Sequence, residues 1–181
     1  MKAMAVCLTF SLAFLSGCGG SPPPADDAGG GPRIIPLETL AEGASSDYGR
    51  IDEMPVPEDA PPECLAIDDE EEFQRLISLA YFPEPIPEVD FESNIVMAVM
   101  QGPKNTAGYS ISITRAFQVG GEVTVEINAV EPEPGSMTAQ VLTSPYHLVL
   151  AERASFEPRG ELTFIFVHQH GDTISQLFAE V

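Results

Sequence analysis

The chain has 181 residues, with 8 Lys and Arg against 28 Asp and Glu, and a formal net charge of −20. This length fits one domain with a tail and excludes a large multidomain enzyme. Phosphate binding needs clustered basic residues, so eight scattered ones exclude a nucleic-acid-binding protein. Hydrophobic residues make up 44% of the chain and include ten Phe, which is enough to bury a core.

The N-terminus has the pattern of an export signal. Lys2 precedes an apolar run from Ala5 to Leu15 that only Thr9 and Ser11 interrupt. As a helix this run would reach about 16 Å, half of a ~30 Å hydrocarbon core, which favours a signal peptide over a membrane span. The run ends in Leu15-Ser16-Gly17-Cys18, which resembles a bacterial lipobox. We therefore predict a signal peptide over residues 1–17 and lipidation of Cys18; an ordinary secretory signal cut nearby is the alternative.

These assignments predict an exported protein whose acylated N-terminus sits in the lipid bilayer of the bacterial cell envelope. Residue 19 is Gly and not Asp, which resembles the sorting pattern of outer-membrane lipoproteins in Gram-negative bacteria. We therefore favour the outer membrane over the inner one. Residues 18–32 are nearly all Gly, Pro, Ala, Asp and Ser and predict a flexible tether. With Cys7 removed and Cys18 acylated, Cys64 would be the one remaining thiol, which excludes an intrachain disulfide and a cysteine-based zinc site.

The next feature is an acidic run that leads into a helix. Residues 68–72 lack the alternating spacing of a calcium loop, whereas carboxylates are favoured at a helix start. Asp68 or Asp69 can cap the helix, and Pro83 ends it. The spacing i, i+3, i+4, i+7 predicts a helix over about residues 69–81 whose apolar face consists of Phe73, Leu76, Ile77 and Ala80.

Further along the chain the periodicity changes to two, which predicts strands. Residues 94–100 form a continuous apolar run, typical of a strand buried on both faces. Gly120-Gly121 predicts a hairpin turn between two alternating segments. In the candidate strand 109–117, Tyr109, Ile111, Ile113 and Phe117 share one face. Three further candidate strands are 123–127, 146–150 and 161–168, and two weaker ones are 33–40 and 63–67.

Together these elements predict a mainly β fold, an antiparallel β sandwich or partly open barrel with one α-helix. We expect a single β-rich domain over residues 33–172, followed by a C-terminal tail over residues 173–181.

Several short motifs resemble the PrcB C-terminal domain family, with a motif core over residues 87–153. They are Pro87-Glu88-Val89-Asp90-Phe91, Gly102-Pro103, Thr106-Ala107-Gly108-Tyr109-Ser110-Ile111, Glu133-Pro134-Gly135-Ser136-Met137 and Leu142-Thr143-Ser144-Pro145-Tyr146. The family usually has Gly where Ala107 stands. The resemblance implies a secreted or lipid-anchored accessory protein, because the named member is a lipoprotein subunit of a bacterial surface serine-protease complex.

Two segments within these motifs, 101–109 and 137–146, are short of charge in an acidic chain. Such a patch can contact a partner without desolvating many carboxylates. We predict that a partner-binding surface includes Lys104, Asn105, Thr106, Gly108, Tyr109, Met137, Thr143, Ser144 and Tyr146. The alternative is that the two tyrosines are core residues and the loops are tight turns, with Gly108 supplying a positive φ.

Candidate chemistry is sparse. His168 and His170 lie two apart at a strand end, with His147 and Asp172 as further candidate metal ligands, but the pattern is also typical of an exposed pair. Ser144 lacks a nucleophile elbow, and neighbouring acids disfavour the Cys64 thiolate. Glu131 and Glu133, between prolines, indicate a stiff loop. We therefore predict no catalytic site, no metal and no cofactor.

The sequence thus favours a non-catalytic, lipid-anchored accessory protein that binds another protein, with an exported protease or surface complex as the expected partner. Two alternatives remain. The segment 105–109 resembles a loop of chagasin-type cysteine-peptidase inhibitors, although the Arg-Pro-aromatic companion loop is absent. A structural envelope lipoprotein without a discrete ligand is the other.

Overall fold

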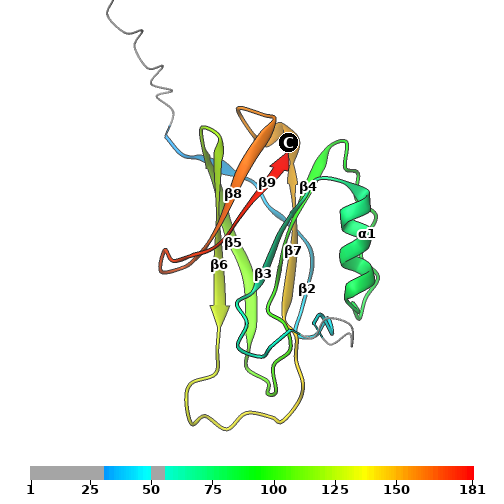
Figure 1. Ribbon diagram of the computed structural model, residues 1–181, viewed down its shortest axis with the longest axis vertical. Coiled ribbons are helices and arrows are strands. Elements are labelled where there is room, and N and C mark those ends of the chain that lie inside the picture. The colour runs from blue at the N-terminus through cyan, green and yellow to red at the C-terminus, as the bar shows by residue number, and fades with distance from the viewer. Residues whose placement is uncertain (1–30, 50–55) are drawn as a thin grey trace, which may run out of the picture.

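The computed structural model describes residues 31–49 and 56–181 and shows two β-sheets with one α-helix beside them (Figure 1). The predicted signal peptide, Cys18 and residues 18–30 of the predicted tether lie outside the described residues. In the described part of the chain, no helix is long and apolar enough to cross a membrane.

Five strands form one sheet and four form the other. In spatial order the first contains β1 (Arg33–Ile35), β5 (Ser110–Val119), β6 (Glu122–Val130), β8 (Glu161–His168) and β9 (Thr173–Glu180). The second contains β2 (Glu38–Gly43), β7 (Tyr146–Glu152), β4 (Asn94–Met100) and β3 (Glu63–Ile67). All pairs are antiparallel except β6 with β8, which are parallel because the chain visits β7 of the other sheet between them. The predicted mainly β fold is confirmed, as a sandwich of two separate sheets.

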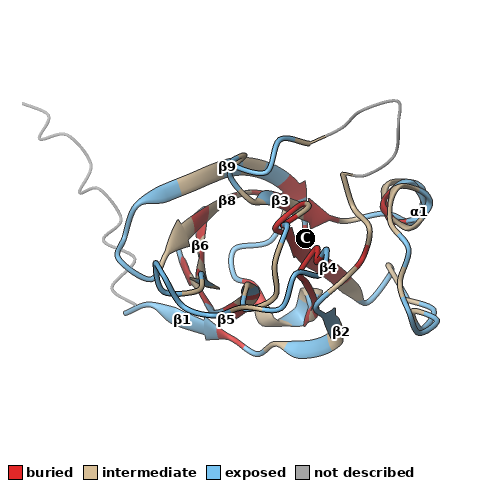
Figure 2. Ribbon diagram, turned by 90° about the horizontal axis from the view of Figure 1, so that it is seen from below, coloured by how far each residue is buried: buried red, intermediate tan, exposed pale blue. Residues whose placement is uncertain are grey.

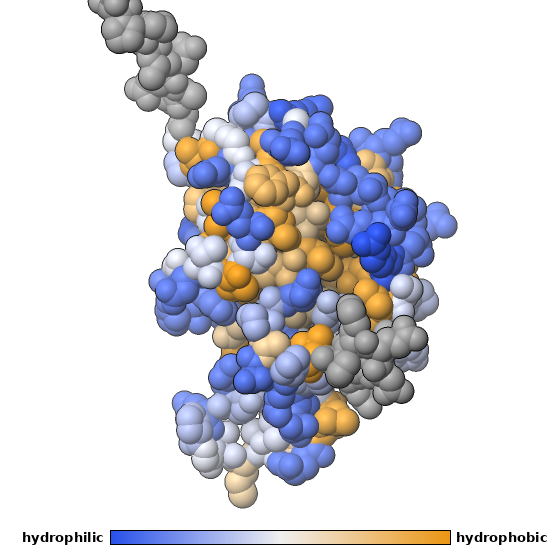
Figure 3. All heavy atoms as spheres, viewed as in Figure 1, coloured by the Kyte–Doolittle hydropathy of each residue, from blue (hydrophilic) through white to orange (hydrophobic). Residues whose placement is uncertain are grey.

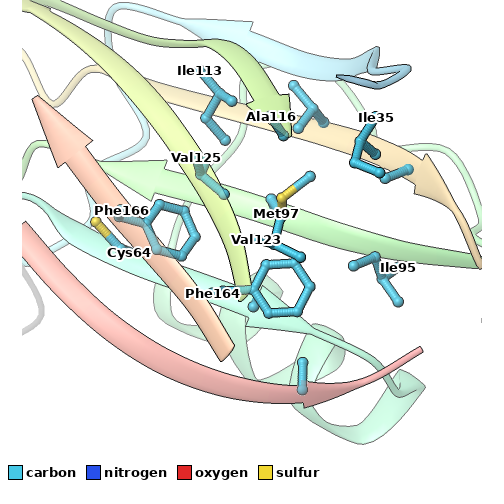
Figure 4. Close-up of a cluster of buried hydrophobic side chains, with 14 of the residues drawn as sticks. Ile35, Cys64, Ile95, Met97, Ile113, Ala116, Val123, Val125, Phe164 and Phe166 are labelled. Atoms are coloured by element: carbon cyan, nitrogen blue, oxygen red, sulfur yellow. The ribbon is translucent and has the colours of Figure 1, made fainter. Parts of the chain in front are cut away.

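The principal core fills the space between the two sheets. Figure 4 shows Met97 of β4 beside Val125 of β6 and the rings of Phe164 and Phe166 of β8. All four side chains are fully buried. Because successive side chains of a strand point to opposite faces, the inward residues of β6 and β8 recur at every second position, as the sequence predicts.

A second apolar cluster lies on the outer side of the four-stranded sheet, under helix α1 (Glu70–Leu79). The Asp69 carboxylate accepts the Glu72 amide hydrogen at 2.8 Å and caps the helix, as predicted. Phe73 and Leu76 are buried against the sheet residues Val96 and Leu148. In Figure 2 the helix stands beside β4, on the side away from the five-stranded sheet.

Two turns in the five-stranded sheet have local causes. Gly120-Gly121 joins β5 to β6 in a two-residue hairpin, as predicted, and Gly120 has a φ of 58°. A bulge between Ile113 and Arg115 shifts the register of β5. The prediction that Phe117 shares the inner face with Ile113 is therefore wrong: after the bulge Ala116 is buried and Phe117 points outward.

The structure corrects two further predictions. The segment 33–40 is not one strand, because the chain leaves β1 at Pro36 and enters β2 in the opposite sheet. Pro36 has no amide hydrogen to continue the ladder. Residues 173–181 are not a tail: 173–180 form the edge strand β9, paired along β8, and Val181 is buried. The apolar side chains Ile174, Leu177 and Ala179 pack on the core and account for this strand.

Candidate partner-binding surface

The two segments predicted to form the surface lie side by side at one end of the sandwich. The loop 101–109 joins β4 to β5, and residues 131–145 join β6 to β7 and project beyond the sheets (Figure 1). The Lys104 amide donates to the Thr143 carbonyl at 2.8 Å, and the Thr143 amide returns the bond at 2.9 Å. The Ala107 amide donates to the Ala139 carbonyl at 3.0 Å. The structure thus brings together two segments that are some 40 residues apart.

Lys104 differs from the expectation of an exposed charge. Its side chain is buried, with a residue exposure of 7%, and its ammonium donates to the Glu58 carbonyl. The same ammonium lies 5.5 Å from the centre of the Tyr109 ring, a cation–π arrangement. The Asn105 side-chain amide donates to the Glu58 carboxylate. Lys104 and Asn105 therefore fasten the segment before β3 to this loop.

Three more of the predicted residues have structural roles. The Thr143 hydroxyl donates to the Thr106 carbonyl at 3.0 Å, and the hydroxyls of Ser144 and Ser46 lie 3.1 Å apart. Tyr146 is buried and meets the Phe82 ring edge-on at 5.0 Å between centroids. These side chains are turned into the protein. For Tyr146 this agrees with the alternative that the two tyrosines are core residues, whereas Tyr109 is only partly buried.

Gly108 is needed for its backbone conformation. Its φ of 99° lies in the region that favours glycine, as predicted. An added Cβ would also come within 3.1 Å of the Pro132 Cβ in the neighbouring loop. Gly108 therefore permits both the turn into β5 and the close approach of the two loops.

The uncharged stretch 135–142 exposes apolar side chains at this end of the sandwich. Met137 is fully exposed, and Val141 and Leu142 are about half exposed, at 48% and 49%. Charges are confined to the loop's beginning, at Glu131 and Glu133. The sequence predicts Met137 as a surface residue but does not single out Val141 or Leu142. The signal that could identify them is an uncharged run without the alternation of a strand.

His147 links the two sheets and does not stand near an open site. Its Nδ1 accepts the Ile113 amide hydrogen of β5 at 2.9 Å, so the neutral ring carries its proton on Nε2 and donates to the Thr39 hydroxyl at 3.1 Å. Burial lowers the pKa of His147, and Glu42, 3.8 Å away, partly opposes this effect. His147 is therefore a neutral hydrogen-bonding group at ordinary pH.

The other candidate chemical groups are also accounted for. His168 ends β8 and His170 lies in the following turn. Within residues 31–49 and 56–181, no group of three or more His, Cys, Asp and Glu side chains is placed to hold a metal ion. Burial, with a contribution from Glu63, raises the pKa of the Cys64 thiol to about 12, so the thiolate is disfavoured.

Comparison with known proteins gives one match. The model of the family described as PrcB C-terminal matches residues 95–150, which include most of β4, all of β5 and β6, the projecting loop and most of β7. No curated protein and no solved structure matches the chain. The matched stretch contains both segments of the candidate surface. Residues 95–150 thus match the PrcB C-terminal family that the sequence motifs resemble.

Proposed function

We propose that this protein is a non-catalytic, lipid-anchored accessory protein of the bacterial cell envelope that docks on another exported protein, with an exported protease as the expected class. The family match supports an accessory role, and the lipobox pattern ending at Cys18 supports the anchor. The observation that carries the docking proposal is the loop 135–142, which exposes Met137, Val141 and Leu142 without a charged side chain.

This loop is suited to binding because it is apolar at the surface and fastened at its base. Because the chain has a net charge of −20, a partner that binds elsewhere on its surface must usually remove water from carboxylates, which is unfavourable. The stretch 135–142 contains no carboxylate, so binding there avoids this penalty. Backbone bonds from Ser136 to Glu133 and from Ala107 to Ala139 restrain the loop, each at 3.0 Å. A restrained loop loses less conformational entropy on binding than a free one.

The docking surface can be tested in cells with a photo-crosslinking residue at position 139, followed by capture of the partner. We expect the triple variant Met137→Ser, Val141→Ser, Leu142→Ser to reduce capture at least tenfold. The matched control is Ile34→Ser with Phe178→Ser, which removes exposed apolar side chains from the five-stranded sheet. Equal capture by both variants would place the docking surface elsewhere.

The anchor is tested separately. Mass spectrometry of the mature N-terminal peptide should find a diacylglyceryl-modified Cys18, and Cys18→Ser should move the protein from the membrane fraction to the soluble fraction. An unmodified N-terminus at another residue would show that the signal is an ordinary secretory one. The purified domain should leave the activity of cysteine peptidases unchanged; dose-dependent inhibition would favour the inhibitor alternative.

A further inference from the structure

A groove runs between helix α1 and the proline-rich connector that follows it. Its volume is about 570 Å³, within the size range of ligand-binding clefts. One wall is α1, and the other is the segment 84–89, whose Pro85 and Pro87 favour a stiff extended backbone. The apolar side chains that line it are Phe73, Ile77, Phe82, Ile86 and Val89.

The charges that line this groove all have one sign. Glu70 lies on the helix wall, and Glu84 and Glu88 lie on the connector wall. No Lys, Arg or His is among the lining residues in the described part of the chain. An acidic segment would be repelled here, whereas Lys or Arg side chains would find three carboxylates around an apolar floor.

The walls of the groove are held in place by contacts made outside it. The Tyr81 amide donates to the Ser46 carbonyl at 2.6 Å, and Phe82 packs against the buried Tyr146. Phe73 meets Phe91 at 5.5 Å between ring centroids. The Tyr81 side chain itself is 67% exposed at the rim. An exposed, positioned tyrosine is a frequent anchor in protein interfaces, and its ring face attracts cations.

We propose that this groove binds a segment of a protein partner in which apolar side chains are flanked by lysines or arginines. The inference rests on the proposed function, because it takes the partner to be a protein, but it concerns a surface separate from loop 135–142. The loop lies at one end of the sandwich (Figure 1), whereas α1, which forms one wall of the groove, lies on the outer side of the four-stranded sheet (Figure 2). The partner's apolar side chains would contact Ile77 and Ile86 while its cations face Glu84 and Glu88.

The probe is a fluorescein-labelled 14-residue peptide with Leu and Lys at helical spacing, and the matched probe has Glu in place of every Lys. Fluorescence anisotropy with the purified domain should show saturable binding of the Lys peptide and none of the Glu peptide. Raising the salt concentration should weaken binding, because the added ions screen the exposed carboxylates of the rim. Equal binding of the two peptides, or no binding of either, would overturn the proposal.

Variants separate the groove from the overall negative charge. Tyr81→Ser with Glu84→Gln and Glu88→Gln should weaken binding of the Lys peptide at least tenfold. The control variant Phe178→Ser with Glu122→Gln and Glu161→Gln makes the same kinds of change at exposed sites on the five-stranded sheet, and should change affinity less than twofold. An equal loss in both variants would mean that the peptide responds only to net charge.

Three further measurements complete the test. All six positions are exposed, so thermal melting should show that both variants remain folded. Sedimentation that reveals a concentration-dependent dimer abolished by the groove variant would assign the groove to a second copy of the chain and overturn the proposal. The triple variant of Met137, Val141 and Leu142 should bind the Lys peptide normally, so failure of the loop as a docking surface and failure of the groove are distinguishable.

Discussion

The two sheets differ in how many of their faces are covered. Residues 95–100 of β4 are all buried, and so are residues 146–149 of β7. In β6 and β8, by contrast, buried residues alternate with partly exposed ones. A strand with two covered faces needs residues that tolerate burial at every position, which are apolar here except for the hydrogen-bonded His147. A strand with one covered face needs apolar residues at every second position. The sequence pattern of a strand thus reports the number of layers around it.

The cause of the difference is the segment between β3 and β4. It contributes α1 and the proline-rich connector, which together cover the outer face of the four-stranded sheet. No corresponding element in the described residues covers the five-stranded sheet, whose outer face carries Ile34, Phe117 and Phe178. In Figure 3 hydrophobic residues gather in the middle of the face that carries β9, whereas hydrophilic residues dominate along α1.

The largest expected effect compares neighbouring residues in the two kinds of strand. In β8, Phe164→Ala should destabilise the fold by about 3–5 kcal/mol because the ring is fully buried, whereas Ile165→Ala should cost under ~1 kcal/mol. In β4, Met97→Ala and Val96→Ala should both cost more than ~1 kcal/mol, since both faces are covered. Urea denaturation measures each change. A small effect of Val96→Ala would show that the helix layer contributes little to stability.

The second effect concerns Arg153, which ties the helix-side layer to the edge of the other sheet. Its guanidinium donates to the carbonyls of Phe91 at 2.9 Å, Asp68 at 2.6 Å and Glu180 at 2.7 Å. Arg153→Ala should cost about 2–4 kcal/mol, because three carbonyls lose charge-assisted bonds. Arg159→Ala, at an exposed site, is the control and should stay within ~0.5 kcal/mol. Equal melting temperatures of the two variants would contradict this role.

The third effect is a pH dependence from the histidine that joins the sheets. Burial holds the pKa of His147 below its ordinary value of 6.5, so the unfolded chain binds its proton more readily than the folded one. The stabilisation is complete above about pH 6.5 and is lost as the pH falls toward the folded-state pKa, with a slope of at most ~1.4 kcal/mol per pH unit. Urea melts at several pH values should show a weaker dependence in His147→Gln. An unchanged dependence would mean that other groups cause it.

The smallest effect is local to the helix. Asp69→Ala removes the carboxylate that accepts the Glu72 amide hydrogen and should cost about 1 kcal/mol, whereas Asp69→Asn should retain most of the cap. Thermal melts of the two variants provide the comparison. If Asp69→Ala leaves stability unchanged, tertiary packing of Phe73 and Leu76 alone holds the helix.

Much of the fold is readable in the sequence because its signals are local. The apolar face of the helix, its cap at Asp69 and the Gly120-Gly121 hairpin depend on residues a few positions apart. The bulge after Ile113 has no such local signature. It exchanges the inward and outward positions of β5 beyond it, so strict alternation predicts the wrong face of the sheet for Phe117. At the candidate surface, the sequence indicated two segments that the structure places side by side, but not which of their side chains point outward: Lys104 is buried and Met137 is exposed.

The sequence by itself determined the mainly β class, the one α-helix of the described residues and the match to the PrcB C-terminal family, because periodicity, caps and short motifs act over neighbouring residues. Only the tertiary structure decided that β1 and β2 enter opposite sheets, that residues 173–180 complete the five-stranded sheet, and that Lys104 reaches the Glu58 carbonyl. The partners of β1, of β2 and of Lys104 lie 46 to 112 residues away in the chain, and no local pattern encodes which of them a segment meets, whereas β9 pairs with β8 over 6 to 19 residues. A side chain is exposed or buried only once such partners have met, which is why the groove beside α1 and the exposure of Val141 and Leu142 emerge from the structure alone.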